Sequence, residues 1–250
     1  MILEDTRVLQ DIRSKRYTVK IAASNKEVAL AQQLRYEVFK EELDREFDFD
    51  DGFDSDDYDE QSHHLIVLEN EENTVIGTYR IQTRELAQSG IGFVSEQRYH
   101  LEDLPDGVLD KGMEVGRACI RGDHRNGRVL YLLWKGFADY MFHFEKRFLF
   151  GYSALNTTDP ARLWALYEEL GEKSQRHPEW EVRVREPYRL ERAVPHPEGA
   201  LELPSLLENY LDVGTRVCSP PSLDNKLGLA HFFILLDLEN VPERTKRLFF

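Results

Sequence analysis

Hydrophobic positions in this chain follow two repeats, a two-residue alternation in some segments and a helical spacing in others, and the two repeats predict its secondary structure. Alternating positions and short apolar runs rich in β-branched and aromatic residues predict strands at 17–23, 64–69, 74–82, 113–120, 148–155, 180–186 and 229–237. Helical spacing predicts helices from Ser24 to beyond Phe39, from Gly127 to about Lys146, from Pro160 to about Leu170, and over 205–213. This order of elements predicts an α/β fold with a mixed sheet.

Two of the predicted helices begin with capping signals. Ser24 is followed three residues later by Glu27, which is the spacing of a capping box. Thr158 or Asp159 precedes Pro160, and proline is favoured at the first helical position because its missing N–H has no partner there in any case. Residues 1–16 carry no decisive pattern, so an amphipathic helix and a loose arm both stay open for them.

The predicted strand at 113–120 is unusual because Glu114 and Arg117 interrupt an otherwise apolar run. Residues three apart in a regular strand face opposite sides, so these two side chains should not meet. Gly116 between them indicates a β-bulge, which would splay this strand from its neighbour. We therefore expect the backbone amides around 118–120 to be available to a ligand.

A polar loop at 121–126 leads from this strand into the helix that opens near Gly127. The first N–H groups of a helix have no intrahelical partner and carry a positive partial charge, so such a place attracts anions. Arg121, Arg125 and Arg128 bracket the loop, and each alone would be an ordinary surface arginine. Together with the glycine at the helix start, they predict a phosphate site.

Residues 44–60 are densely acidic, with phenylalanine and tyrosine residues interleaved. Most carboxylates of such a run are solvated, but the aromatic residues are unusual for a disordered one. We expect the segment to fold as a lid over a cationic substrate, with Asp56 and Asp59 nearest the site. Arg80 lies inside an apolar strand and requires a carboxylate partner, because an unpaired buried charge is very costly.

Composition narrows the class of protein. The chain has 250 residues, of which 41% are hydrophobic, enough for a sizeable core. Its formal net charge of −14 argues against nonspecific nucleic-acid binding. Cys119 and Cys218 lack metal-ligand spacing, so we expect a reducing cytoplasmic compartment, no disulfide and no metal. No apolar run approaches the ~20 residues of a membrane span.

Six short motifs, taken in order, resemble the GNAT-superfamily N-acyltransferases. They are LRYEVFKEE, an acidic run ending in DDYD, HHLIV, VIGTYRI, EVGRACI with a following HRN, and LFGYSAL. The chain is similar in particular to the hemolysin-like branch that includes the ornithine-lipid (amino-acid) N-acyltransferases, and in turn to acyl-homoserine-lactone synthases. The resemblance implies a GNAT-like, mostly antiparallel mixed sheet with a splayed central strand and flanking helices.

The resemblance also assigns site residues and substrates. It implies an acyl thioester on acyl carrier protein, delivered to an amine. The usual phosphate loop of the superfamily, Arg/Gln-x-x-Gly-x-Gly/Ala, is degenerate here and reads RNGR at 125–128. This departure favours a carrier protein that presents phosphopantetheine over tight binding of free coenzyme A. The matching positions are Arg35, Phe39, Asp56, Asp59 and Arg80 for substrate, Glu114 and Arg117 for catalysis, and Cys119, Ile120, Arg121, Arg125, Asn126, Gly127 and Arg128 for the pantetheine arm.

Acyl transfer from a thioester requires an amine that loses its proton, donors for the oxyanion, and a leaving thiolate. Glu114 is the candidate general base, directly or through one water, and its structural alternative is a buried ion pair with a nearby arginine. Asp56 and Asp59 either clamp Arg35 and Arg80 or contact a cationic amino acid. Tyr167 occupies a place where some GNAT enzymes keep a tyrosine acid, but packing is the favoured role.

We therefore expect an N-terminal arm or helix at 1–16 and a single GNAT-like domain at 17–250. Its acyl-donor half would span 17–155 and its C-terminal half 156–250. The expected reaction moves a fatty acyl group from acyl carrier protein to the amino group of an amino acid. Three alternatives stay open: a homoserine-lactone-type synthase that uses S-adenosylmethionine, a coenzyme-A-dependent acetyltransferase, and a catalytically silent binding module. A peripheral contact with the inner face of the membrane is left open as well.

Overall fold

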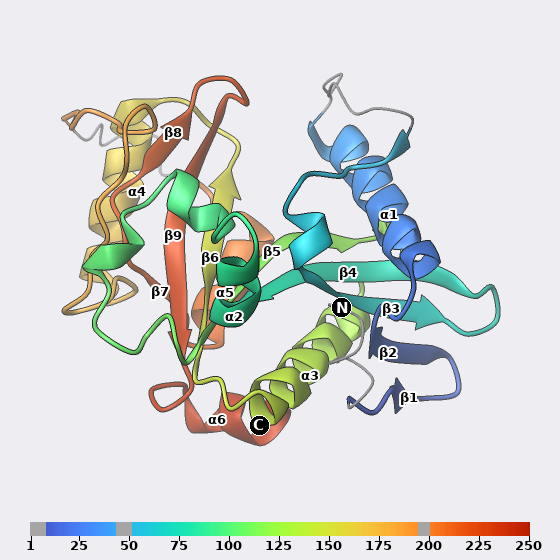
Figure 1. Cartoon of the computed structure of the whole chain (residues 1–250). Coiled ribbons are helices and arrows are strands. Elements are labelled where there is room, and N and C mark those ends of the chain that lie inside the picture. Colours follow the sequence, from blue (N-terminus) through green and yellow to red (C-terminus); the bar gives the residue numbers. More distant parts are fainter. Residues whose placement is uncertain (1–8, 44–51, 195–200) are drawn as a thin grey trace. The chain divides into compact units, whose positions relative to one another are not determined.

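The computed structural model describes residues 9–43, 52–194 and 201–250 (Figure 1). Within these ranges it contains nine β-strands and six α-helices, joined by short 3₁₀ turns. The fold is mixed α/β with a mostly antiparallel sheet, as predicted. No helix in the described ranges is long and apolar enough to cross a membrane. The chain forms two compact units, the first built from 1–92, 115–146 and 249–250 and the second from 93–114 and 147–248.

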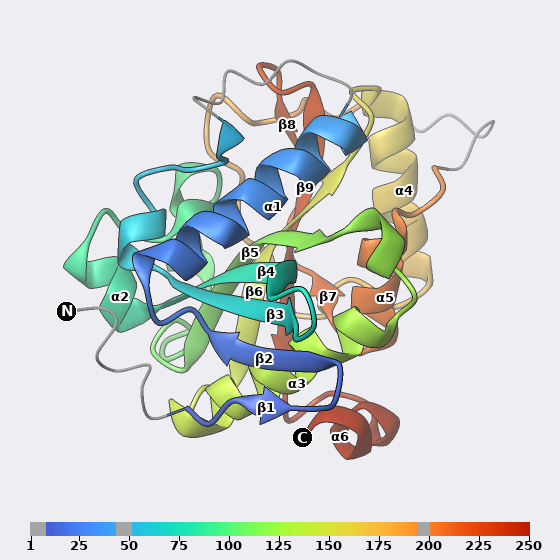
Figure 2. The same ribbon diagram turned by 90° about the vertical axis from the view of Figure 1, so that its right-hand side faces the viewer.

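The first unit is an antiparallel sheet covered by a helix on each face (Figure 2). Its strands follow one another in the order β1 (Ile12–Arg13), β2 (Tyr17–Ile21), β3 (His63–Glu69), β4 (Thr74–Thr83) and β5 (Gly112–Ile120), of which residues 115–120 belong to this unit. Its helices are α1 (Asn25–Leu43), the short α2 (Arg84–Ser89) and α3 (Arg128–His143).

The two faces of this sheet are set by side-chain alternation along β3 and β4. Ile66 packs in one hydrophobic cluster with Ala31 and Leu34 of α1. On the other face, α3 comes so close that a Cβ built on its Gly136 would lie 2.8 Å from the Leu65 side chain. Since Leu65 and Ile66 are neighbours in β3, they point to opposite sides of the sheet and α1 and α3 cover opposite faces.

The second unit is built on the long antiparallel pair of β6 (Phe148–Leu155) and β9 (Leu229–Asp237). The short strands β7 (Arg216–Val217) and β8 (Ser222–Asp224) also pair with β9. Its helices are α4 (Pro160–Glu172), α5 (Ser205–Asp212) and α6 (Glu243–Phe249), the last of which runs into the residues assigned to the first unit. The opening residues of β5, Gly112 to Glu114, run parallel to Phe148 to Phe150 of β6.

The predicted irregularity of β5 is present, but its left-handed residue is Arg117 and not Gly116. Arg117 has a φ of 51°, a value that costs a non-glycine residue about 1–2 kcal/mol. The φ angle of Gly116 is not positive, and a Cβ built on this residue meets no atom within 4 Å. The parallel pairing of β5 with β6 ends at Glu114, three residues before the left-handed position.

Most of the predicted elements are confirmed, with end points shifted by a few residues. Strand β6 has the predicted bounds, and Asp159 caps α4 by accepting hydrogen bonds from the amides of Ala161 and Arg162. In the predicted capping box, Ser24 Oγ accepts from the amide of Glu27, whereas the Glu27 carboxylate accepts from Ala23.

The predicted strand at 180–186 is wrong. Its alternation is real, but the segment makes only a single bridge, between Val184 and Tyr99. The amides of Val182 and Arg185 donate to the carbonyls of Cys218 and Arg98, two places far apart in sequence, so that no continuous strand lies beside it.

Two expectations fall partly outside the described residues. Of the N-terminal segment, residues 1–8 lie outside, and Ile12–Arg13 forms strand β1 where an arm or a helix was expected. Of the acidic segment, residues 44–51 lie outside, so the lid at 44–60 is described only from Gly52 onward. The single domain at 17–250 stays a prediction.

Candidate active site

Three arginines and three aspartates of the first unit gather into one cluster, called here the Arg–Asp cluster. Its cations come from regular elements and its carboxylates from the described end of the acidic segment, which lies beside α1 (Figure 1). Ion pairs join all six residues into one network. The members are Arg35 of α1, Arg80 of β4, Arg117 of β5, and Asp54, Asp56 and Asp59.

Arg35 forms the buried floor of the Arg–Asp cluster. Its Nη1 and Nη2 atoms donate to the two carboxylate oxygens of Asp59 at 2.9 and 2.6 Å. Its Nε atom lies 2.8 Å from Oδ2 of Asp54, and neither Arg35 nor Asp54 has an exposed side chain. The bidentate contact of Arg35 with Asp59 matches the planar shape of the guanidinium and is among the strongest ion-pair geometries.

Arg80 and Arg117 continue the cluster toward solvent. Arg80 bonds Asp56, and its Nη1 also lies 3.0 Å from Oδ1 of Asp59. Arg117 donates to Asp56 Oδ2 at 3.0 Å, and its Nε lies 3.2 Å from Asp54. The side chains of Asp56 and Arg117 are 28% and 32% exposed, so this pair is the part of the cluster that a solute reaches.

Electrostatics fix the protonation states around Asp59. Burial alone raises the pKa of Asp59, but the hydrogen bonds and charges of Arg35 and Arg80 outweigh it and hold that pKa well below its usual range. Burial, with the nearby arginine charges, lowers the pKa of His64 to about 4 despite the opposing effect of Asp59. Asp59 therefore stays ionised and His64 stays neutral near pH 7.

The predicted clamp is thus confirmed for Asp56 and Asp59, with Arg35 and Arg80 as their partners. Phe39, one turn after Arg35, lies with its ring centroid 5.9 Å from the guanidinium carbon of Arg117. The shared face of Arg35 and Phe39 therefore points at the cluster, as their spacing along the helix indicates.

Asp54, Gln32 and His64 belong to the same site and were missed by sequence reasoning. Gln32 donates to Asp59 at 3.1 Å and lies one turn before Arg35, so helical spacing from Arg35 is the signal that could have found it. Asp54 carries no such signal, because it looks like its many acidic neighbours.

Glu114 lies in the second unit and binds the start of a 3₁₀ turn, Val94–Gln97. Its carboxylate accepts hydrogen bonds from the amides of Val94 and Ser95, both at 2.8 Å, and from the Ser95 hydroxyl at 2.5 Å. The residue is only 4% exposed. These contacts give Glu114 a structural function, and Val94 and Ser95 carried no sequence signal for it.

The loop after β5 keeps its arginines near the start of α3. Arg125 and Arg128 are exposed, whereas Arg121 is held by Asp123 at 3.0 Å and lies within 4 Å of Glu69. The Asn126 side chain accepts from the Arg128 amide at 3.0 Å, and Gly127, the N-cap residue of α3, occupies the left-handed region with a φ of 79°. The loop therefore presents two exposed cations beside a helix N-terminus.

Two of the residues that the resemblance assigns to the pantetheine arm make structural contacts within the first unit. The Cys119 side chain is buried in the cluster that packs α1 on the sheet, so that only its backbone remains as a contact for a ligand. The carbonyl of Ile120 accepts from Arg125 Nε at 3.0 Å, which ties the end of β5 to the loop.

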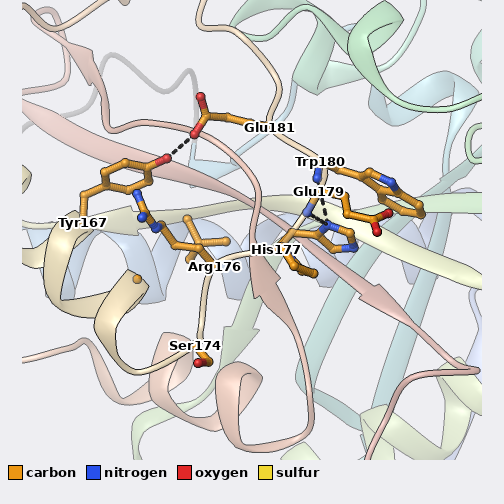
Figure 3. A pocket seen from close by; sticks show the side chains of 10 residues that line it. Tyr167, Ser174, Arg176, His177, Glu179, Trp180 and Glu181 are labelled. Carbon is orange, nitrogen blue, oxygen red and sulfur yellow. Dashed lines mark hydrogen bonds between the residues drawn. The ribbon is translucent and has the colours of Figure 1, made fainter.

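Tyr167 of α4 belongs to a separate pocket of the second unit (Figure 3). Its hydroxyl donates to Glu181, and burial together with that carboxylate raises its pKa above the usual value. Tyr167 therefore keeps its proton, and we find it in a packing position, stacked on Phe232 with ring centroids 6.0 Å apart.

The matched family is described as an acetyltransferase (GNAT) domain and covers residues 34–135. The L-ornithine N(alpha)-acyltransferase of Brucella abortus is 27% identical over 90% of this chain and 86% of its own length. The protein of the same name from Rhodobacter capsulatus is 26% identical over 93% of this chain and 94% of its own. The chain is therefore similar to GNAT-type N-acyltransferases over most of its length, and its residues 34–135 match the GNAT domain itself.

A solved structure shares the fold of this chain. The CoA-dependent acyl-homoserine lactone synthase BjaI, solved with MTA, superposes with a TM-score of 0.52 at 16% identity, over 90% of this chain and 81% of that one. The GNAT match runs from the residue before Arg35 to the first two turns of α3. It therefore contains the whole Arg–Asp cluster, Glu114 and the arginine loop.

Proposed function

We propose that this N-acyltransferase moves a fatty acyl group from a thioester on acyl carrier protein to the α-amino group of an amino acid of the ornithine class. The observation that carries the proposal is the break in β5, where pairing with β6 ends at Glu114 and Arg117 turns left-handed. A strand broken in this way has amides that its neighbour does not use, and amides of this kind stabilise an oxyanion. The names of the two curated relatives support ornithine as acceptor.

In this scheme the acceptor nitrogen attacks the thioester carbon and forms a tetrahedral oxyanion. The oxyanion collapses by breaking the carbon–sulfur bond, the amine proton passes to a base, and the thiolate leaves and is protonated. The amides of Ala118 to Ile120 are the proposed donors to the oxyanion or to the pantetheine arm. The enzyme thereby forms an amide bond and releases the free carrier thiol.

Glu114 is the proposed base, acting through one water. Its carboxylate accepts hydrogen bonds from Val94 and Ser95. In this scheme one water takes the amine proton and passes it on to the carboxylate. The same three hydrogen bonds hold the carboxylate in one orientation.

Asp56 and Arg117 are the proposed contact of the cluster with the acceptor. They form its partly exposed ion pair and carry the two charges that an amino acid needs. Arg117 is suited to the carboxylate of the acceptor and Asp56 to its ammonium group. Arg35, Arg80 and Asp59 hold that pair in place from beneath.

Arg125 and Arg128 are the proposed contacts for the phosphate of the pantetheine arm. Their charges complement acidic surfaces as well as phosphate, and the degenerate RNGR sequence offers fewer backbone contacts to a free nucleotide. This combination favours acyl carrier protein over coenzyme A as the donor.

The test is a set of parallel assays with the purified full-length chain. Acyl carrier protein loaded with a long acyl chain is offered L-ornithine, and thiol release and N-acylornithine are measured by mass spectrometry. Acyl-coenzyme A replaces the carrier in a second assay, and S-adenosylmethionine replaces ornithine in a third. N-acylornithine in the first assay, with no product in the other two, supports the proposal. Lactone in the third assay, product from acyl-coenzyme A alone in the second, or no thiol release with any acceptor would each overturn it.

A further inference from the structure

The second unit contains a pocket of about 430 Å³ that the proposed acyl transfer does not use (Figure 3). Its walls come from the end of α4, the loop after it and β7. The side chains that carry its chemistry are Tyr167, Arg176, His177, Glu179, Trp180 and Glu181.

Arg176 packs at one side of this pocket against Tyr167 and Gly171. Its guanidinium carbon lies 4.3 Å from the centroid of the Tyr167 ring. A Cβ built on Gly171 would lie 2.5 Å from Nη2 of Arg176, so the guanidinium packs directly against the glycine backbone. Within the described ranges, no carboxylate oxygen lies within 4.0 Å of a guanidinium nitrogen of Arg176, so Arg176 forms no ion pair there. A positioned cation with no carboxylate of its own is a ready site for an anion.

His177 and Trp180 form a flat wall on the other side. Their rings stack at a centroid distance of 4.3 Å with 17° between the planes. Nδ1 of His177 accepts hydrogen bonds from the amides of Trp180 at 2.9 Å and Glu179 at 3.3 Å, so this nitrogen carries no proton. Desolvation lowers the pKa of His177, in agreement with a neutral ring near pH 7. This wall therefore contributes an apolar surface without a second positive charge.

Glu179 and Glu181 add negative charge to the pocket beside the one arginine. Glu181 accepts a hydrogen bond from the Tyr167 hydroxyl, and within the described ranges neither glutamate forms an ion pair. Two carboxylates repel a polyanion such as a phosphate monoester, but they attract an ammonium group. A ligand that satisfies both signs has one carboxylate and one ammonium.

We propose that this pocket binds a free α-amino acid. The carboxylate of the ligand lies on the guanidinium of Arg176, its ammonium on Glu179 or Glu181, and its side chain against the His177–Trp180 wall. The pocket is large enough for such a molecule, and all of its walls belong to one unit. The proposal depends on this pocket alone and holds whichever amine the enzyme acylates.

The test measures binding to the full-length chain by isothermal titration calorimetry and by tryptophan fluorescence. L-leucine is the probe, with N-acetyl-L-leucine lacking the ammonium, L-leucinamide lacking the carboxylate, and inorganic phosphate as the polyanion. We expect L-leucine to bind about 10-fold more tightly than either derivative, and phosphate to bind more weakly still. Trp180→Phe identifies the signal, because the other tryptophans, Trp134 and Trp164, are absent from the pocket walls.

Two variants change the arginine in different ways. Arg176→Gln removes the charge, and we expect it to weaken L-leucine binding about 10-fold or more. Gly171→Ala keeps the charge but pushes the guanidinium aside, and alanine is at least as favourable as glycine in α4, so binding should fall while the fold stays intact. Lys173→Gln, on an exposed lysine of the same region, is the matched control and should bind as the wild type does.

Equal binding of L-leucine and its two derivatives would overturn the proposal, and so would unchanged binding in Arg176→Gln. Loss of binding in Arg176→Gln supports it, whether or not acyl transfer also changes. A rise in the acceptor KM of that variant would identify the pocket as an acceptor site, whereas unchanged kinetics would identify a second amino-acid site. Failure of acyl transfer to ornithine in the wild type, with intact L-leucine binding, would refute only the proposed function.

Discussion

Asp59 holds Arg35 through both of its carboxylate oxygens, at 2.9 and 2.6 Å. The two side chains are only 4% and 0% exposed, so water does little to screen the charges. A buried pair of this kind stabilises little in net terms, because both ions lose their hydration when the chain folds. Loss of one partner is different, since it leaves an uncompensated charge in the interior.

Replacing Arg35 with methionine is therefore expected to lower the free energy of unfolding by ~3–5 kcal/mol. Asp54 and Asp59 would each lose one of their two arginine partners, although methionine fills much of the volume. Urea unfolding followed by circular dichroism measures the change. Lys40→Met, on the exposed side of the same helix, is the control and should change stability by less than ~0.5 kcal/mol. Equal losses in both variants would contradict the buried role of Arg35.

The left-handed backbone of Arg117 predicts an order of stability between two variants. Arg117→Ala and Arg117→Gly both remove the contacts to Asp54 and Asp56. Only glycine relieves the strain of a φ of 51°, so the glycine variant should be about 1 kcal/mol more stable than the alanine variant. Urea unfolding of the two proteins side by side measures the difference. An alanine variant of equal or greater stability would show that β5 is regular at this residue.

The same alanine variant tests the proposed contact with the acceptor. Because the Arg117 side chain is 32% exposed, its ion pairs should contribute no more than ~1 kcal/mol to stability. Loss of a charge-assisted hydrogen bond to the acceptor carboxylate should raise the KM for ornithine about 10-fold and leave the KM for the acyl donor unchanged. Arg16→Ala, on an exposed arginine of the first unit, serves as the control. A KM effect on the donor alone would place Arg117 at the thioester.

Local signals predicted much of this fold. Strand β6 is a short apolar run with few alternatives, and Asp159 before Pro160 has a direct physical reason to begin a helix. The segment at 180–186 shows the limit of such signals. Its alternation describes which side chains are buried, but a strand also requires a partner strand, and the partners of Val182 and Arg185 are determined by distant parts of the chain.

The sequence predicted contacts of the candidate site where a buried charge requires a partner of opposite sign, and it did not predict the other contacts. A buried Arg80 needs a carboxylate partner, and Asp56 and Asp59 were the candidates because they lie at the end of the acidic segment nearest the next strand and match the aspartates of the resembled family. Asp54 looks the same as the solvated aspartates around it, and only the folded arrangement shows that it is completely buried against Arg35. The hydrogen bonds of Glu114 to Val94 and Ser95 depend on a 3₁₀ turn that carries no periodic pattern.

Glu114→Ala is expected to reduce acyl transfer by roughly the 10²–10⁴-fold that a lost acid–base group costs. Ser95→Ala removes one hydrogen bond to the same carboxylate but leaves both amide contacts, so its loss should be smaller. The pH dependence of kcat/KM separates the roles. A base loses its acidic limb in Glu114→Ala, whereas a purely structural carboxylate leaves the shape of the profile unchanged. Near-native turnover in a folded Glu114→Ala protein would remove this residue from the mechanism.

Charge reversal in the loop tests the proposed donor contact. Arg125→Glu together with Arg128→Glu should raise the KM for acylated carrier protein about 10-fold and flatten its dependence on salt, because attraction to the acidic carrier is lost. The KM for ornithine should not change. Arg244→Glu, on an exposed arginine of α6, is the matched control. A salt dependence that survives the double substitution would place the carrier contact elsewhere.

His231 predicts how stability depends on pH. The residue is buried in β9, and burial together with the charge of Arg98 lowers its pKa from 6.5 to about 3. Between pH 6.5 and about 3, His231 therefore binds a proton in the unfolded chain but not in the folded chain. Folding stability consequently falls as the pH drops through this range. Each pH unit in that window costs up to about 1.4 kcal/mol from this group alone. His231→Leu cannot take up the proton, and its free energy of unfolding should fall less steeply between pH 6.5 and 4. The check is urea unfolding of both proteins at several pH values, and parallel pH profiles would mean that His231 titrates normally in the fold.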